Sequence, residues 1–252
     1  MNTKIKTAGV LVIGNEILSG RTQDQNVSYI GKYLEKLGIV LMEVSVIPDI
    51  EQTIIDKVLV YSENYDYVFT TGGIGPTHDD ITAASIAKAF NKKLLRSSDA
   101  VACMENYYEP GMLTEARLKM ADIPGDASLI ANPVSGAPGF QLHNVFVLAG
   151  VPSIMQAMLD SLRNSFVGGP PVLTASISTN LGESVLAEGM GKIQEENNDV
   201  SIGSYPYFKK GKLGVNIVLR SIEHDCLLKQ IESILDLVKE KGGKILEQNL
   251  PE

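Results

Sequence analysis

The segment that decides the fold of this chain is Thr70-Thr71-Gly72-Gly73-Ile74-Gly75-Pro76-Thr77-His78-Asp79-Asp80-Ile81-Thr82. It follows an apolar run at residues 67–69, which predicts a strand, and it precedes a helix-like run at residues 81–90. Glycines between a strand and a helix let the backbone approach an anion, and the first-turn N–H groups and the helix dipole favour negative charge there. The segment therefore predicts a phosphate-binding loop.

Two adjacent aspartates, Asp79 and Asp80, lie in the same loop. They would repel a bare phosphate, so we expect a divalent cation between protein and phosphate, because hard cations take oxygen ligands from carboxylates and from the substrate. A structural interpretation stays open, in which Thr77 and Asp80 form a helix-capping pair and the glycines only make a turn. The fingerprints of commoner nucleotide sites are missing, since Gly73-x-Gly75-x-x-His78 lacks a third glycine and no Gly-x-x-x-x-Gly-Lys-Ser/Thr occurs.

The first 165 residues or so alternate between strand-like and helix-like runs. Strands are expected at residues 7–13, 39–47 and 67–71, helices at residues 26–37, 50–63, 81–90, 98–108, 114–121 and 152–164, and a hairpin over residues 140–149. The β-α-β-α order implies right-handed crossovers and a mostly parallel α/β sheet covered on both faces. The hairpin would add an antiparallel edge.

The clearest punctuation in the chain is Gly168-Gly169-Pro170-Pro171. We therefore expect one domain at residues 1–168 and a second, small α+β domain at residues 169–252. The second domain is expected to contain strands at residues 172–178, 200–205 and 215–221 and helices at residues 183–195 and 225–241.

Composition narrows the class of protein. The 252 residues are 44% hydrophobic, which is enough for a full core, and the net charge of −8 argues against a general nucleic-acid binder. No apolar run approaches the roughly 18 residues that a membrane span requires, and no apolar run follows the polar residues 1–6 as in a signal peptide. Cys103 and Cys226 are far apart and lack metal-ligand spacing, so we expect reduced thiols in a cytoplasmic protein.

Ligands of open α/β sheets bind outside the carboxyl ends of the strands. Four loops follow expected strands, and their polar side chains would share one cleft if the strands are parallel: Asn15, Glu16, Arg21, Asp49, Asp79 and Asp80. Four acids in one rim destabilise the fold unless a cation neutralises them. Structural alternatives remain, because Asp49 can cap the helix expected at residue 50 and Arg21 can be a solvated surface charge.

A second glycine-rich turn, Ser135-Gly136-Ala137-Pro138-Gly139, leads into the hairpin. Its small residues could admit a planar ring or a ribose. A tight turn without a ligand is an equally valid interpretation.

These motifs together resemble the N-terminal family of competence/damage-inducible protein A (CinA). The resemblance covers residues 7 to about 160 and is carried by residues 13–26, residues 71–82, Asn132-Pro133, Ala137-Pro138-Gly139 and Gly150-Val151-Pro152. It implies the MoaB/Mog molybdopterin-binding fold, a three-layer α/β/α domain. The C-terminal unit resembles the KH-like module that follows this domain in CinA proteins. The amidase domain of longer CinA proteins is not expected, because the sequence ends at Glu252.

The resemblance implies a nucleotide pyrophosphatase that uses Mg, Mn or Co and acts on ADP-ribose-like or FAD-like diphosphates. The related Mog branch adenylylates molybdopterin, and its catalytic acids fall at Asp49 and Asp80. That branch usually has a basic residue where Asp79 stands, so the Asp79-Asp80 pair favours the pyrophosphatase. The chain departs from the family's usual pattern at Ala149, Ile154 and Ser135-Gly136.

The leading hypothesis is metal-dependent hydrolysis of a nucleotide diphosphate linkage. Asp80, with Asp79 and with Asp49 or Glu16, would hold the cation that activates water, and Arg21 would stabilise the leaving phosphate. Substrate contacts are expected at Asn15, Gly72, Gly73, Gly75, Thr77, Thr82, Gly136, Pro138, Gly139 and Gly150. The alternatives are adenylyl transfer to molybdopterin and a pterin- or nucleotide-binding module without turnover. We expect a homo-oligomer whose partner is a small molecule and neither nucleic acid nor a membrane.

Overall fold

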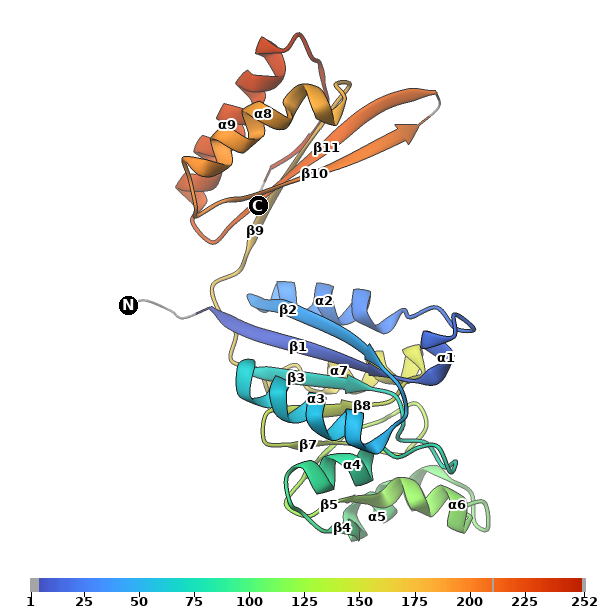
Figure 1. The fold of residues 1–252 in the computed structure, drawn as a ribbon. Coiled ribbons are helices and arrows are strands. Elements are labelled where there is room, and N and C mark those ends of the chain that lie inside the picture. Colours follow the sequence, from blue (N-terminus) through green and yellow to red (C-terminus); the bar gives the residue numbers. More distant parts are fainter. Residues whose placement is uncertain (1–4, 210, 251–252) are drawn as a thin grey trace. The chain divides into compact units, whose positions relative to one another are not determined.

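The computed structural model describes residues 5–209 and 211–250 of the chain (Figure 1). The chain divides into two compact units, Met1–Gly169 and Pro170–Glu252. The division falls inside Gly168-Gly169-Pro170-Pro171, the segment in which the sequence places the boundary. In the described part of the chain, no helix is both long enough and apolar enough to cross a membrane.

A six-stranded sheet forms the centre of the first unit, with the strand order β2-β1-β3-β8-β7-β6. Its strands are β1 (Lys6–Ile13), β2 (Ile39–Ile47), β3 (Tyr67–Thr71), β6 (Ser128–Ile130), β7 (Gly139–Leu142) and β8 (Val145–Leu148). The pairs β2/β1, β1/β3 and β3/β8 are parallel, and β8/β7 and β7/β6 are antiparallel. The predicted mostly parallel sheet is confirmed. The expected hairpin, formed by β7 and β8, is not the edge of the sheet, because β6 pairs with the outer side of β7. The sequence did not predict β6, which is too short to show an alternating pattern.

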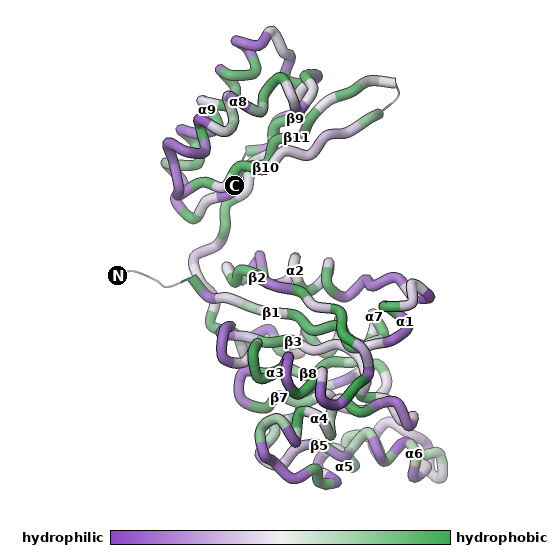
Figure 2. The backbone as a smooth tube through the Cα atoms, in the orientation of Figure 1, coloured by the Kyte–Doolittle hydropathy of each residue, from purple (hydrophilic) through white to green (hydrophobic). Residues whose placement is uncertain are grey.

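Helices cover both faces of this sheet, and each face has its own hydrophobic core. The helices are α2 (Asn26–Lys36), α3 (Glu51–Asn64), α4 (Thr82–Ala89) and α7 (Pro152–Ser161). Val10 and Val12 of β1 pack in the core that α2 and α7 cover, whereas Leu11 and Ile13 pack in the core of α3 and α4. A strand buried on both faces must be apolar throughout, and much of β1 is coloured hydrophobic in Figure 2. The three-layer α/β/α architecture is therefore confirmed.

An extension lies between α4 and β6 in the chain. It consists of β4 (Leu94–Arg96), α5 (Ser98–Tyr107), α6 (Glu115–Leu118), the 3₁₀ turn η1 (Lys119–Ala121) and β5 (Asp122–Pro124). β4 and β5 pair as a two-stranded antiparallel sheet, in which Arg96 and Asp122 form an ion pair at 2.6 Å. The single helix expected over residues 114–121 is divided into α6 and η1, which places Lys119 at the start of a tighter turn.

The second unit is a four-stranded antiparallel sheet, with strand order β10-β11-β9-β12, and two helices. Its elements are β9 (Leu173–Thr179), α8 (Glu183–Glu195), β10 (Ser201–Lys209), β11 (Lys212–Ser221), α9 (His224–Glu240) and β12 (Ile245–Asn249). Both helices pack on one face of the sheet (Figure 1), over a core that includes Ile177, Ile217 and Ile234. The β-α-β-β-α-β order is the split-βαβ, or ferredoxin-like, arrangement. The likeness to a KH-like module stays a prediction.

Candidate functional site

The candidate site lies at the edge of the first sheet where the parallel strands end. The loops after β1, β2, β3 and β8 all leave from this edge, and β7, which runs antiparallel to β8, begins there. Backbone hydrogen bonds join the loops in pairs. The Gly14 N–H donates to the Ile47 carbonyl (3.1 Å), and the Gly72 N–H donates to the Leu148 carbonyl (3.2 Å). The parallel strands thus bring the four loops to one edge of the sheet, as expected from the sequence.

The glycine–aspartate loop, residues 72–81, begins with a backbone conformation that favours glycine over other residues. Gly72 and Gly73 have φ values of 102° and 67°, in the left-handed region that favours glycine. A Cβ on Gly72 would also collide with the carbonyl oxygen of Ile13, and a Cβ on Gly150 would lie 3.2 Å from the Gly72 Cα. The glycines after β3 and β8 therefore let two strand ends approach each other closely.

Thr82 fixes the position of this loop. Its hydroxyl donates to the Gly72 carbonyl (3.0 Å), and its N–H donates to the Gly73 carbonyl (3.0 Å). Thr82 is fully buried, so its hydroxyl serves the loop backbone, whereas the sequence suggested a direct contact with phosphate. Ile74 adds a second anchor, because its side chain packs against both hydrophobic cores.

Three consecutive N–H groups of this anchored loop are available to a ligand. Among the residues that the structure describes, the backbone N–H groups of Gly73, Ile74 and Gly75 donate to no protein acceptor. All three residues are half-buried. Unpaired N–H groups held on a rigid loop suit a phosphate or another anion.

Asp79 and Asp80 converge on Thr77. The Asp80 carboxylate accepts hydrogen bonds from the Thr77 N–H (2.8 Å) and the Thr77 hydroxyl (2.6 Å), and an Asp79 oxygen lies 2.5 Å from the same hydroxyl. A hydroxyl has one proton, so it can donate to one carboxylate at a time. Two negative charges therefore share one donor, which is an arrangement that a cation would stabilise.

The Thr77 hydroxyl is the main reason why the pKa of Asp79 is held below its ordinary value of 3.8, with smaller contributions from the Asp79 backbone N–H, His78 and Lys119. Helix α4 begins only at Thr82, and its N-cap residue, Ile81, has no side-chain capping bond. Thr77 and Asp80 therefore close a turn within the loop, and they do not cap the helix as the structural interpretation supposed.

Lys119 is a site residue that sequence reasoning missed. Its ammonium donates to the Thr77 carbonyl, across 42 positions of the chain. It also lines a hollow of about 70 Å³ together with Gly73, Gly75, Asp80 and Pro138. No spacing rule joins residues so far apart, and the lysine lay inside an expected helix. The loop thus has a cation beside its two carboxylates.

The acids of the other loops are placed around the turn after β1. Helix α1 (Asn15–Leu18) begins there, and the Asp49 carboxylate accepts the Asn15 N–H (2.8 Å). The Glu16 carboxylate lies over Gly14, because a Cβ on that glycine would be 2.5 Å from Glu16 Oε1. Asp49 thus binds the start of α1, and the N-cap residue of α3 has no side-chain capping bond. Arg21 is exposed in the loop that follows α1.

The acids therefore lie in two groups, Asp79 with Asp80 and Glu16 with Asp49. Within residues 5–209 and 211–250, no group of three or more His, Cys, Asp or Glu side chains lies close enough together to hold a metal ion. A cation at either group would have to complete its coordination with phosphate oxygens, water or other oxygen ligands. The metal ligands named from the sequence stay a prediction.

Asn26 is a second residue that sequence reasoning did not place in the site. It is 4% exposed, and its Nδ2 donates to the Gly150 carbonyl (2.8 Å). Its Oδ1 is buried and has no partner in the described part of the chain, and the same holds for the Thr71 hydroxyl at the end of β3. Buried polar atoms are normally hydrogen-bonded, so a buried acceptor beside the glycine loops is suited to an N–H group of a ligand.

The glycine-rich turn before β7 contributes one residue to the hollow. Asn132 holds the turn, because its Nδ2 donates to the Ala137 carbonyl (2.6 Å). Pro138 lines the hollow beside the glycine–aspartate loop. Gly136 lies instead against the Tyr107 side chain, and Gly139 lets β7 pack closely on Val147. Of the three residues of this turn that were expected to touch substrate, Pro138 is the one that the structure brings to the loop.

Comparison with known proteins finds a matching family for each of the two domains. Residues 9–168 match the family described as a probable molybdopterin binding domain, and residues 171–243 match the middle domain of FAD synthase. A protein of Archaeoglobus fulgidus is 33% identical over 228 residues, which cover 90% of this chain and 97% of the relative. A probable FAD synthase of Caenorhabditis elegans is 30% identical over 260 residues, which cover 92% of this chain and 50% of that protein.

Among solved structures, a similar one is the crystal structure of the protein CinA, of unknown function, from Thermoplasma acidophilum. It is 38% identical, has a TM-score of 0.60, and the match covers 64% of this chain and 97% of that one. The resemblance to CinA proteins is thereby confirmed. Because the matched family spans residues 9–168 and therefore most of the chain, this protein belongs to the family of probable molybdopterin-binding domains.

Proposed function

We propose that the first domain binds a dinucleotide diphosphate of the FAD type at the glycine–aspartate loop and hydrolyses its diphosphate linkage with the help of a divalent cation. The observation that carries this proposal is the juxtaposition of three unpaired N–H groups, at Gly73, Ile74 and Gly75, with the converging carboxylates of Asp79 and Asp80. The N–H groups suit phosphate oxygens. The carboxylates do not, unless a cation lies between them and the diphosphate.

The choice of an FAD-like substrate is supported by the combination of domains. A family that is named for molybdopterin binding is followed here by a match to the middle domain of FAD synthase. The probable FAD synthase of Caenorhabditis elegans aligns with 92% of this chain, so the alignment includes both domains. FAD has the planar ring, the diphosphate and the second nucleoside that a site made of several loops can contact.

In the proposed reaction each residue of the site has a separate role. The N–H groups of residues 73–75 hold one phosphate, and the Lys119 ammonium lies close enough to the loop to neutralise the charge that develops on it. Asp79 and Asp80 would hold a divalent cation, which when bound neutralises the diphosphate and activates water. Arg21, exposed after α1, is suited to the leaving phosphate. The buried Oδ1 of Asn26 can accept an N–H from the ring.

Adenylyl transfer to molybdopterin is the second candidate, and the family match favours it. It would use the same anion loop, and the Asn26 acceptor would suit a pterin N–H as well as a flavin N–H. The two reactions differ in the acceptor of the cleaved phosphate. Hydrolysis transfers it to water, whereas the transferase needs a pterin before any diphosphate is consumed.

The decisive experiment is incubation of the full chain with FAD, ADP-ribose or NAD and with Mg²⁺, Mn²⁺ or Co²⁺, in water enriched in ¹⁸O. We expect mononucleotide products without added pterin, one of them carrying the label, and no turnover after treatment with EDTA. The variant Asp80→Asn keeps an oxygen for the Thr77 N–H but removes the charge, so turnover should fall at least about 100-fold while the fold persists. Asp56→Asn, on the exposed side of α3, is the matched control.

Full turnover in EDTA, or a fully active Asp80→Asn protein, would contradict the role of the carboxylates. Consumption that begins only when a pterin is added would assign the site to the transferase. Saturable binding of FAD without any product, with each of the metal ions, would show that the domain is a binding module without turnover.

A further inference from the structure

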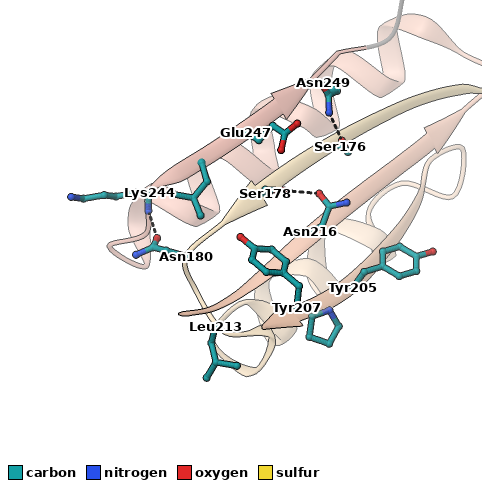
Figure 3. A pocket seen from close by; sticks show the side chains of 12 residues that line it. Ser176, Ser178, Asn180, Tyr205, Tyr207, Leu213, Asn216, Lys244, Glu247 and Asn249 are labelled. Carbon is teal, nitrogen blue, oxygen red and sulfur yellow. Dashed lines mark hydrogen bonds between the residues drawn. The ribbon is translucent and has the colours of Figure 1, made fainter. Parts of the chain in front are cut away.

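The uncovered face of the second domain's sheet contains a groove of about 1130 Å³ that the proposed function does not use (Figure 3). Helices α8 and α9 cover the opposite face, where alternate residues such as Ala175 and Ile177 are buried. The residues between them, Ser176 and Ser178, therefore point to the uncovered face and lie in the floor of the groove. All the residues that line it belong to the second domain.

The strand register places four groove residues in one row. Tyr205 pairs with Asn216, Asn216 with Ser178, and Ser178 with Glu247, so the row crosses β10, β11, β9 and β12. Neighbouring strands are 4.7–4.9 Å apart, so the row spans about 15 Å. The small Ser178 lies in the middle and larger side chains lie on either side of it, which makes the surface concave.

Two tyrosine rings lie over glycines of this sheet. A Cβ on Gly214 would be 2.5 Å from the Tyr207 ring, and a Cβ on Gly203 would be 3.2 Å from the Tyr205 ring. Tyr207 is held by a hydrogen bond from its hydroxyl to the Thr179 carbonyl (3.3 Å). Tyr205 stays 54% exposed. An exposed ring that leans on a sheet is a surface on which a planar heterocycle can stack.

Polar groups lie along the same row of the sheet as Tyr205, and Asn216 is next to it. The Ser178 hydroxyl donates to the Asn216 Oδ1 (3.0 Å), which leaves the amide nitrogen as a donor (Figure 3). Glu247 is an exposed acceptor. In the described part of the chain neither group has another partner. They lie two strands apart, so the Asn216 amide is the group that can reach the edge of a ring stacked on Tyr205. Lys244, exposed at the rim, has a flexible stem and an ammonium suited to a phosphate.

From these contacts we propose that the groove binds a mononucleotide, with its ring stacked on Tyr205 beside Asn216 and its phosphate at Lys244. A single-stranded nucleic acid is a poorer match, because such a ligand needs a track of cations, whereas this floor contains Glu247 and the chain has a net charge of −8. The choice of flavin mononucleotide (FMN) as the first probe rests on the proposed function. The groove itself does not, since FMN has no diphosphate linkage to hydrolyse.

The test measures the binding of FMN, riboflavin and AMP to the full chain by calorimetry and by flavin fluorescence. We expect saturable FMN binding that Tyr205→Ala weakens at least about tenfold, because stacking is lost, and that Tyr205→Phe retains. Phe208→Ala is the matched control, because Phe208 is a more exposed aromatic residue of the same strand (70% against 54%) that does not line the groove. Lys244→Gln should weaken FMN several-fold and leave riboflavin unchanged.

Three results would overturn the proposal. The first is no binding of any of the three compounds at millimolar concentration. The second is FMN binding that is insensitive to Tyr205→Ala but is lost in Asp80→Asn, which would place the ligand in the first domain. The third is tight binding of a single-stranded oligonucleotide that Tyr205→Ala abolishes. FMN binding of the expected kind without FAD hydrolysis would support the groove and contradict the proposed function alone.

Discussion

The two candidate sites are built from different parts of the polypeptide. The glycine–aspartate loop presents backbone N–H groups, and its shape depends on left-handed glycines and on the buried Thr82. The groove of the second domain presents side chains from a regular sheet whose backbone bonds are made within the ladder. A site made of backbone is part of the fold, so we expect its substitutions to cost stability and function together. In a site made of side chains that point outward, we expect substitutions to reduce function without a loss of stability.

The largest loss of unfolding free energy is expected for a substitution at Gly72, and its control separates the collision of a new Cβ from the strain of the backbone. Gly72→Ala places a Cβ against the Ile13 carbonyl at a φ of 102°, so it should cost about 2–4 kcal/mol of unfolding free energy. Gly111→Ala is the control, since Gly111 has a φ of 82° but no atom within 4 Å. It should cost about 1 kcal/mol. Equal losses for both variants in urea unfolding would show that the close approach at Gly72 contributes nothing.

A second prediction concerns the bond that fixes the loop. Thr82→Val keeps the shape of the side chain and leaves the Gly72 carbonyl without its partner, so it should cost about 1–3 kcal/mol. Turnover should fall with it. Thr70→Val, twelve positions earlier in β3, is the control, because the Thr70 hydroxyl is buried without a partner in the described residues.

We expect Thr70→Val to be neutral or stabilising, since it removes an unpaired buried polar group. Denaturation curves and FAD turnover for both variants, with Thr82→Ser as the conservative rescue, measure the difference. A Thr82→Val protein as stable and active as Thr70→Val would remove Thr82 from the support of the loop.

The fold was predictable from the sequence because its signals are local. Periodicity and punctuation within short windows predicted the longer strands and helices of both domains, except β12, and the glycine-rich segment marked the anion loop. Residues joined by tertiary contacts were not predictable in this way. Lys119 meets Thr77 across 42 positions, and Asn26 meets Gly150 across 124. The row from Tyr205 to Glu247 exists only through strand register, and no pattern in the sequence indicated β12.

Other expectations from the sequence stay predictions. They are the identity of the metal ion, self-association and a cytoplasmic location. The capping roles considered for Asp49 and Asp80 fail for a physical reason, because a capping side chain must bind the first turn of its helix, and these two carboxylates bind Asn15 and Thr77 instead.

A third prediction tests the core that supports the loop by changing the pH. Burial raises the pKa of Tyr61 to about 12 from its ordinary 10.0. The folded state therefore holds this proton where the unfolded state has lost it, so the contribution to stability is complete below pH 10 and is lost as the pH rises toward 12. We expect the first domain to lose of the order of 2 kcal/mol over this interval.

Tyr61→Phe gives the control for this prediction. It removes the hydrogen bond to the Ser45 hydroxyl (2.7 Å), so it should cost about 1 kcal/mol at pH 8. The loss between pH 10 and 12 should then be smaller than in the parent protein. Calorimetric scans at several pH values measure both, and an identical alkaline loss in the two proteins would contradict the role of Tyr61.

The smallest effect on stability is expected in the groove. Asn216→Ala removes a side chain on the uncovered face and its one hydrogen bond from Ser178, so the unfolding free energy should change by less than about 1 kcal/mol. The neighbouring Ile217→Ala should cost about 2–5 kcal/mol, because Ile217 is fully buried under the helices. If the groove is a site made of side chains, Asn216→Ala should weaken FMN binding while it melts with the parent protein. A variant that loses stability in proportion to its loss of binding would mean that Asn216 belongs to the structure of the sheet, and the contrast with the glycine loop would disappear.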